Sequence, residues 1–140
     1  MELHDTLKNL TQAAGCFTEI RFHSKKSRVI SILKGELSEM SFRRYEGVGI
    51  RVLVNGTWGF ASTSELSEQG LNRALKNAVD MARSLSVRKK EKAELASGSL
   101  ASGVFALPGY DELGKMSIEE KLELVKSSEA KLRNNSKKIE

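Results

Sequence analysis

The sequence is poor in the residues that build disulfide frameworks, metal sites and rigid loops: one cysteine, two histidines and one proline among 140 residues. With Cys16 alone, no internal disulfide bond can form and no cysteine-rich zinc site exists. No apolar run approaches the roughly 18 residues that a membrane span needs. Residues 1–5 lack the features of a signal peptide. We therefore expect a soluble protein of the reducing cytoplasm, with no membrane partner.

Positive charge is in excess but is not concentrated. The net charge is +5 and the isoelectric point is about 9.4, which permits an acidic partner such as nucleic acid. The basic residues form four separate groups, and all but the first have acidic residues nearby in the sequence: 25–28, 43–44, 88–92 and 137–138. We favour a solvated surface over a binding stripe.

Apolar periodicity predicts a core within the first 85 residues. Leu3, Leu7 and Leu10 recur at helical spacing and Gly15 follows as a stop signal, which predicts a short amphipathic helix over 3–14. After this helix the period changes to two, which is typical of strands. The next segments are predicted, in order, as a strand, a turn, a strand, its continuation past a bulge at Gly35, and a second turn: 16–22, 23–27, 28–34, 36–42 and 43–47.

The strongest local signal is a β-hairpin. Apolar residues alternate from Val48 to Val54, Asn55–Gly56 follows, and residues 57–62 run back. Asn-Gly between two apolar runs favours a type I′ turn, because both turn positions need a positive φ. A two-residue loop then fixes three facing pairs: Val54 with Thr57, Leu53 with Trp58, and Val52 with Gly59.

Both faces of this hairpin carry apolar side chains: Leu53, Trp58 and Phe60 on one, and Ile50, Val52 and Val54 on the other. We therefore expect the hairpin in the middle of a sheet that is covered on both sides, with Trp58 and Phe60 in the core. Gly47, Gly49 and Gly59 lie in or beside it and indicate a twist, or another chain segment that comes close.

Two further helices are predicted from their caps. Ser67 can cap a helix over 68–85. Its apolar stripe comprises four residues at helical spacing: Leu71, Leu75, Ala78 and Ala82. Ser117 and Glu120 form a capping box, which predicts a helix over 118–133.

The predicted fold class is α+β. A mainly antiparallel sheet of about four strands, including the 48–54/57–62 hairpin, packs with helices at 3–14, 68–85 and 118–133. Residues 86–116, which contain a Ser/Gly/Ala-rich stretch and the proline, are predicted as an irregular excursion.

Side chains capable of catalysis are scattered along the chain. A zinc peptidase helix needs two histidines one turn apart, but His4 has no second histidine on its helix and His23 is predicted in a turn. Cys16 has no histidine beside it in the sequence. Glu36 and Glu39 are interpreted as surface charge rather than as paired acids. From the residues alone, we assign no catalytic, cofactor-binding or metal-binding residue.

Two other patterns resemble ligand sites. Gly47 and Gly49 lack the third glycine of a dinucleotide fingerprint and open a strand rather than a helix, so they are not a phosphate loop. Two aromatic and two arginine residues suggest a sheet that stacks bases: Trp58, Phe60, Arg51 and Arg43. We place the aromatic pair in the core instead.

The stretch Gly47–Thr63, with the sequence GVGIRVLVNGTWGFAST, resembles the N-terminal domain of the TldD/PmbA family, described as modulators of DNA gyrase. Three shorter segments are similar to it as well: 65–67, 18–21 and 34–37. The resemblance covers most of the chain and is specific over 47–85. It is loose over 86–116, where alanine, serine and glycine replace the expected prolines.

This resemblance implies a much longer protein. Family members of the TldD type are zinc-dependent peptidases that degrade unfolded or small peptides in the cytoplasm, and their His-Glu-x-x-x-His motif lies beyond this region. No residue here matches that motif, so no catalytic role carries over. The Trp58–Gly59–Phe60 form resembles the TldD branch more than the metal-free PmbA (TldE) branch. We expect residues 1–140 to be the N-terminal domain, with the zinc-binding C-terminal domain absent from this chain.

Three functions remain open. The first is a non-catalytic domain of a zinc metallopeptidase, which helps to enclose a peptide substrate or contacts a partner subunit in a homo- or hetero-oligomer. The second is a basic nucleic-acid-binding module linked to gyrase modulation. The third is a metal-free partner subunit. We favour the first, because a hairpin that is apolar on both faces suits a scaffold.

Overall fold

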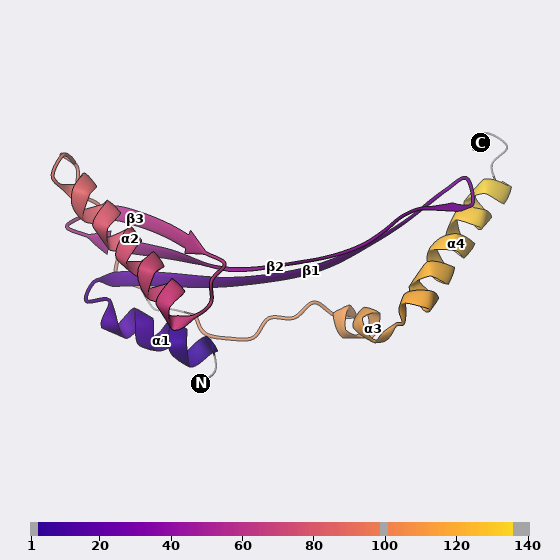
Figure 1. Cartoon of the computed structure of the whole chain (residues 1–140), viewed down its shortest axis with the longest axis horizontal. Coiled ribbons are helices and arrows are strands. Elements are labelled where there is room, and N and C mark those ends of the chain that lie inside the picture. The colour runs from indigo at the N-terminus through magenta and orange to yellow at the C-terminus, as the bar shows by residue number, and fades with distance from the viewer. Residues whose placement is uncertain (1–2, 99–100, 136–140) are drawn as a thin grey trace. The chain divides into compact units, whose positions relative to one another are not determined.

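The computed structural model describes residues 3–98 and 101–135, and confirms the α+β class. The elements are, in order, α1 (Leu3–Ala13), β1 (Phe17–Leu33), β2 (Glu36–Val54), β3 (Thr57–Thr63), α2 (Glu68–Ser86), α3 (Tyr110–Lys115) and α4 (Ile118–Asn135), as Figure 1 shows. The chain divides into two compact units. Unit 1 comprises Met1–Lys25 and Arg44–Ser97, and unit 2 comprises Lys26–Arg43 and Gly98–Glu140.

The sheet has three strands rather than the expected four, in the order β1-β2-β3. Residues 23–27 and 43–47 were predicted as turns and are strand, because each lies inside an uninterrupted ladder between β1 and β2. The reversal occurs instead at Lys34–Gly35, with φ angles of 52° and 85°. Positive φ at both positions is the requirement of a tight two-residue hairpin turn, so the bulge expected at Gly35 is wrong.

The second hairpin forms as predicted. Asn55 and Gly56 have φ angles of 49° and 70°, which is the left-handed region that a type I′ turn requires. The predicted pairs of β2 with β3 are all observed: Val54 with Thr57, Leu53 with Trp58, and Val52 with Gly59. This register assigns each side chain of the hairpin to one of the two faces of the sheet.

One face of the sheet is buried under α2, as Figure 1 shows. Val48, Ile50 and Val52 lie on this face and are almost fully buried. The predicted stripe of α2 packs there, and its members are all buried, together with Ala74: Leu71, Leu75, Ala78 and Ala82. Leu10 of α1 joins the same cluster. All the buried apolar residues in the described part of the chain thus lie within the first 85, as predicted.

Helix α2 begins at the predicted cap and approaches β3 very closely. The Ser67 hydroxyl accepts a hydrogen bond from the Gly70 amide at 3.1 Å. A Cβ atom added to Gly59 of β3 would lie 2.0 Å from the Ala78 carbonyl oxygen and 2.9 Å from the Ala82 Cβ. Glycine at 59 therefore allows the helix backbone to touch the strand, as the sequence indicated for a segment that comes close.

The opposite face is not covered as the sequence predicted. Strand β3 is an edge strand, so the hairpin does not lie in the middle of the sheet. Phe60 is 55% exposed and Trp58 is only half-buried, so neither belongs to the core. The reason is that this face also carries Arg51, whose charge favours a surface that stays in contact with water.

Unit 2 contains the Lys34–Gly35 turn and the last two helices. The Gly35 amide donates to Glu129 Oε1 of α4 at 3.1 Å. The predicted capping box is present: Ser117 Oγ accepts from the Glu120 amide at 3.1 Å, and the Ser117 amide donates to Glu120 Oε2 at 2.6 Å. Residues 86–116 are irregular as expected except for the end of α2 and the short helix α3, which was not predicted; residues 99 and 100 lie outside the described part.

The close approach at Gly59 predicts that Gly59→Ala destabilises the protein by about 1–3 kcal/mol, because the new methyl group meets a backbone carbonyl that cannot move alone. Gly49→Ala is the matched control in the adjacent strand, since a Cβ there would meet no atom within 4 Å. Urea unfolding of the two variants measures the difference. Equal stability of both variants would contradict the packing of α2 on β3.

Candidate functional site

The candidate site is the face of the sheet that α2 does not cover, here called the open face. It presents side chains from all three strands: Phe17, Glu19 and Arg21 from β1, Arg51 and Leu53 from β2, and Trp58 and Phe60 from β3. Aromatic rings and guanidinium groups thus lie side by side on a solvent-facing surface. This composition is typical of surfaces that bind another molecule.

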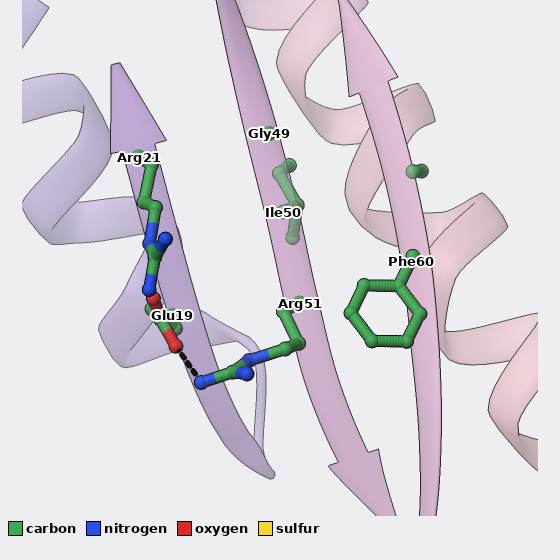
Figure 2. A pocket seen from close by; sticks show the side chains of 7 residues that line it. Glu19, Arg21, Gly49, Ile50, Arg51 and Phe60 are labelled. Atoms are coloured by element: carbon green, nitrogen blue, oxygen red, sulfur yellow. Dashed lines mark hydrogen bonds and ion pairs between the residues drawn. The ribbon is translucent and has the colours of Figure 1, made fainter. Parts of the chain in front are cut away.

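A carboxylate bridged by two arginines organises the open face. Glu19 accepts from Arg21 Nε at 2.5 Å, and its other oxygen accepts from Arg51 Nη2. Figure 2 shows that Arg51 reaches from the middle strand to Glu19 on β1, while Arg21 lies beside Glu19 on the same strand. Two guanidinium groups share one carboxylate, so the cluster keeps one excess positive charge.

Arg51 is held from two sides. Its guanidinium carbon lies 4.6 Å from the centroid of the Trp58 ring, which is the geometry of a cation–π contact. Phe17 packs against the same Trp58 ring in a T-shaped arrangement, with 5.8 Å between the two ring centroids. Arg51 Nε is buried and has no hydrogen-bond partner in the part of the chain that the structure describes. The aromatic contact and the Glu19 pair therefore fix the direction of this side chain.

A hollow of about 220 Å³ lies beside this cluster. Glu19, Arg21 and Arg51 line it on one side and Phe60 on the other, with Gly49 between them, as Figure 2 shows. No atom lies within 4 Å of the position that a Cβ on Gly49 would take. The missing side chain of Gly49 is what opens the hollow.

The two arginines also act on the acidity of Glu19. The hydrogen bond from Arg21 lowers the pKa of Glu19 below its usual 4.5, and Arg51 lowers it further by a hydrogen bond and its charge, while partial burial acts in the opposite direction. Glu19 is therefore ionised at neutral pH, and the ion pairs are fully formed there.

The side chains that the sequence raised as chemical candidates are not brought together. His4 is exposed on α1, and His23 is exposed within β1 rather than in a turn. The Cys16 thiol lies 3.7 Å from the Thr18 hydroxyl. Glu36 and Glu39 both lie on β2, and their odd spacing directs them to opposite faces of the strand. Gly47 and Gly49 lie inside β2, so no helix begins after them.

The described residues do not fit a zinc ion. Across residues 3–98 and 101–135, no group of three or more histidine, cysteine, aspartate or glutamate side chains could hold a metal. Zinc in structural and catalytic sites needs at least three such protein ligands. No chemical step is therefore assigned to a metal in this part of the protein.

Sequence reasoning missed the cluster of Glu19, Arg21 and Arg51. It considered Arg51 with Trp58 and Phe60, but it placed the aromatic pair in the core. The alternation of Glu19 and Arg21 on a strand was a signal that they share a face. Their pairing with Arg51 depends on how β1 lies against β2, which the mistaken bulge at Gly35 obscured.

Comparison with known proteins identifies the domain. Residues 18–82, which include the whole open face apart from Phe17, match the family model described as PmbA/TldA metallopeptidase domain 1. Residues 18–82 are therefore similar to the first domain of the PmbA/TldD family. The open face lies within the region of similarity.

Two curated relatives are archaeal metalloproteases. The chain is 28% identical to a metalloprotease of Methanocaldococcus jannaschii over 79% of its own length and 25% of the relative's. It is 42% identical to a metalloprotease of Methanothermobacter thermautotrophicus over 49% of its own length and 15% of the relative's. The chain thus spans a quarter or less of the length of these relatives.

Two solved structures have a fold similar to that of this chain. TldE from Thermococcus kodakarensis matches 97% of this chain and 30% of its own, with a TM-score of 0.67 and 16% identity. A proposed DNA gyrase modulator from Thermotoga maritima matches 89% of this chain and 27% of its own, with a TM-score of 0.64 and 22% identity. The likeness shows the fold. No helix in the described residues is both long and apolar enough to cross a membrane.

The bridged carboxylate predicts a pH-dependent contribution to stability. At pH 7, Glu19→Gln should lower the free energy of unfolding by about 0.5–1 kcal/mol, the range of partly exposed ion pairs. Because the folded pKa of Glu19 is depressed, this contribution is fully present above pH 4.5 and is lost as the pH falls through the folded value.

Urea unfolding of the protein and of Glu19→Gln at several pH values measures this contribution. The two stability curves should converge under acidic conditions. Glu91→Gln, at an exposed position of unit 1, is the control and should run parallel to the unchanged protein. A Glu19→Gln curve that also runs parallel at every pH would show that the bridge does not stabilise the fold.

Proposed function

We propose that this chain is a non-catalytic first domain that acts within a longer PmbA/TldD-type zinc metallopeptidase of the cytoplasm. It helps to enclose the peptide substrate or contacts a partner subunit. The single observation that carries the proposal is the match of residues 18–82 to the first domain of a metallopeptidase family. The catalytic zinc and its ligands belong, in this proposal, to a C-terminal domain.

The construction of unit 1 supports a binding role rather than a chemical one. Among the described residues, no three histidine, cysteine, aspartate or glutamate side chains come together, whereas the open face gathers aromatic and charged groups around a hollow. A rigid core of α2 on β2 and β3 holds that face in place. Such a surface can orient a peptide or a partner subunit without taking part in bond cleavage.

The branch of the family bears on the role of the whole protein. We propose the catalytic TldD branch on the basis of the Trp58–Gly59–Phe60 sequence. A metal-free TldE-type subunit is the alternative, and TldE from Thermococcus kodakarensis has the same fold. Assembly with a second family member, identical or different, suits either role.

Nucleic-acid binding is the second candidate, because Phe60 is exposed beside Arg51 and Arg21. Single-strand binders stack successive bases on free aromatic faces along a basic groove. Here Arg51 covers the Trp58 ring. The fourth basic group, 137–138, lies outside the described residues. The open face therefore offers no continuous stacking platform, because Arg51 covers the Trp58 ring and Phe17 packs edge-on against the same ring.

The proposal predicts that the 140-residue chain cleaves no peptide. A mixture of unstructured peptides incubated with the purified chain, with and without added zinc, should give identical mass spectra, because the described residues provide no metal site. Casein fragments are suitable substrates, and a chain sample treated with chelator is the control. Zinc-dependent cleavage products would overturn the proposal.

For nucleic acid we expect only nonspecific affinity, with dissociation constants of about 10⁻⁴–10⁻⁶ M at physiological salt. The described basic groups lie on different elements, with 25–28 in β1, 43–44 in β2 and 88–92 after α2, so we expect few phosphates to be contacted at once. Fluorescence anisotropy with a labelled single-stranded oligonucleotide, repeated at several salt concentrations, measures both the affinity and the number of contacts. Submicromolar binding at physiological salt would favour the nucleic-acid function over the peptidase role.

A further inference from the structure

We infer that the hollow at Gly49, between the arginines and Phe60, is a binding site for the carboxylate group of a peptide. The inference rests on the proposed function, since it names where a PmbA/TldD first domain holds its peptide. The carboxylate is the C-terminus of the peptide, whose two oxygens meet the arginines.

The cluster of Arg21, Arg51 and Glu19 has a net charge that is complementary to a carboxylate. Arg21 and Arg51 share the single carboxylate of Glu19, which leaves one positive charge without a counter-ion in the cluster. Arg21 uses only its Nε toward Glu19, and its side chain is 78% exposed, so the two terminal nitrogens face solvent. A guanidinium fork of this kind matches a carboxylate with two parallel hydrogen bonds.

The Arg51 side chain is already held in place before a ligand binds. The Trp58 ring and Glu19 hold Arg51 from two sides, so a ligand need not order this side chain when it binds. The hollow of about 220 Å³ is open at Gly49, where a side chain would otherwise stand. A ligand carboxylate can therefore approach the arginines over bare backbone.

Phe60 supplies the apolar wall that a peptide needs. Its ring is 55% exposed and lines the hollow opposite the arginines. A residue that carries a carboxylate next to an apolar side chain fills both sides of the hollow. A nucleotide would bring a phosphate but would find one ring, with the Trp58 face already covered by Arg51.

The test uses the full 140-residue chain, labelled with ¹⁵N, and the peptide acetyl-Ala-Phe-Gly with a free C-terminus. Its C-terminal amide is the matched ligand without the charge. The free acid should shift the amide signals of Gly49 and Phe60 and bind about tenfold more tightly than the amide, because hydrogen bonds to charged groups are the stronger ones.

Three substitutions probe the site. Arg21→Gln should weaken binding of the acid about tenfold, whereas Arg73→Gln, at an arginine that pairs with Glu65 at the start of α2, should leave it unchanged. Gly49→Val fills the hollow and should abolish binding, while its urea midpoint shows that the strand still folds. Glu19→Gln removes the carboxylate that competes with the ligand for both arginines, while the Trp58 ring still holds Arg51, and should tighten binding severalfold.

Several results would overturn the site. These are equal affinity for the acid and the amide, binding unaffected by Arg21→Gln, or shifts of Gly49 and Phe60 that a single-stranded oligonucleotide produces at lower concentration than the peptide. Peptide-induced shifts confined to other residues would also remove the site, but they would leave the proposed function standing. That function fails only through the cleavage and nucleic-acid experiments described above, so the two failures are distinguishable.

Discussion

The close packing of α2 on the hairpin of β2 and β3 is the contact on which the rest of unit 1 depends. It requires Gly59, because any side chain there would run into the carbonyl of Ala78. It also requires the small residues Ala78 and Ala82 on the helix, which are completely buried. With this contact in place, one face of the sheet is a dry core. The other face stays in contact with water.

The open face follows from that asymmetry. One covered face is enough to stabilise a three-stranded sheet, so the second face can carry charge at modest cost. The ion pairs of Glu19 with Arg21 and Arg51 lie there, and the Trp58 ring fixes one of the arginines. The same residues that make the face polar also make it rigid. A charged and partly aromatic surface of this kind suits the proposed peptide-holding role.

Similarity to a metallopeptidase family is compatible with the lack of a metal-binding group among the described residues. The relatives are longer than this chain, and the residues described here supply a scaffold and a surface rather than a metal site. In the proposed arrangement, binding and bond cleavage are therefore separated between domains. In that arrangement, the affinity of the first domain for a peptide affects how tightly the peptide is bound more than how fast it is cleaved. Kinetic measurements on a longer protein can separate these two effects.

The sequence by itself determined what local chemistry controls: the caps at Ser67 and Ser117, the buried stripe of α2, and the Asn55–Gly56 turn with its register. Each depends on neighbours in the chain, so its signal is complete within a few residues. Only the tertiary structure decided that Lys34–Gly35 is a hairpin turn and that one face of the sheet stays open. Both depend on pairing and packing between segments far apart in the chain. For the same reason the cluster of Glu19 with Arg51, 32 residues apart, was out of reach of any local pattern.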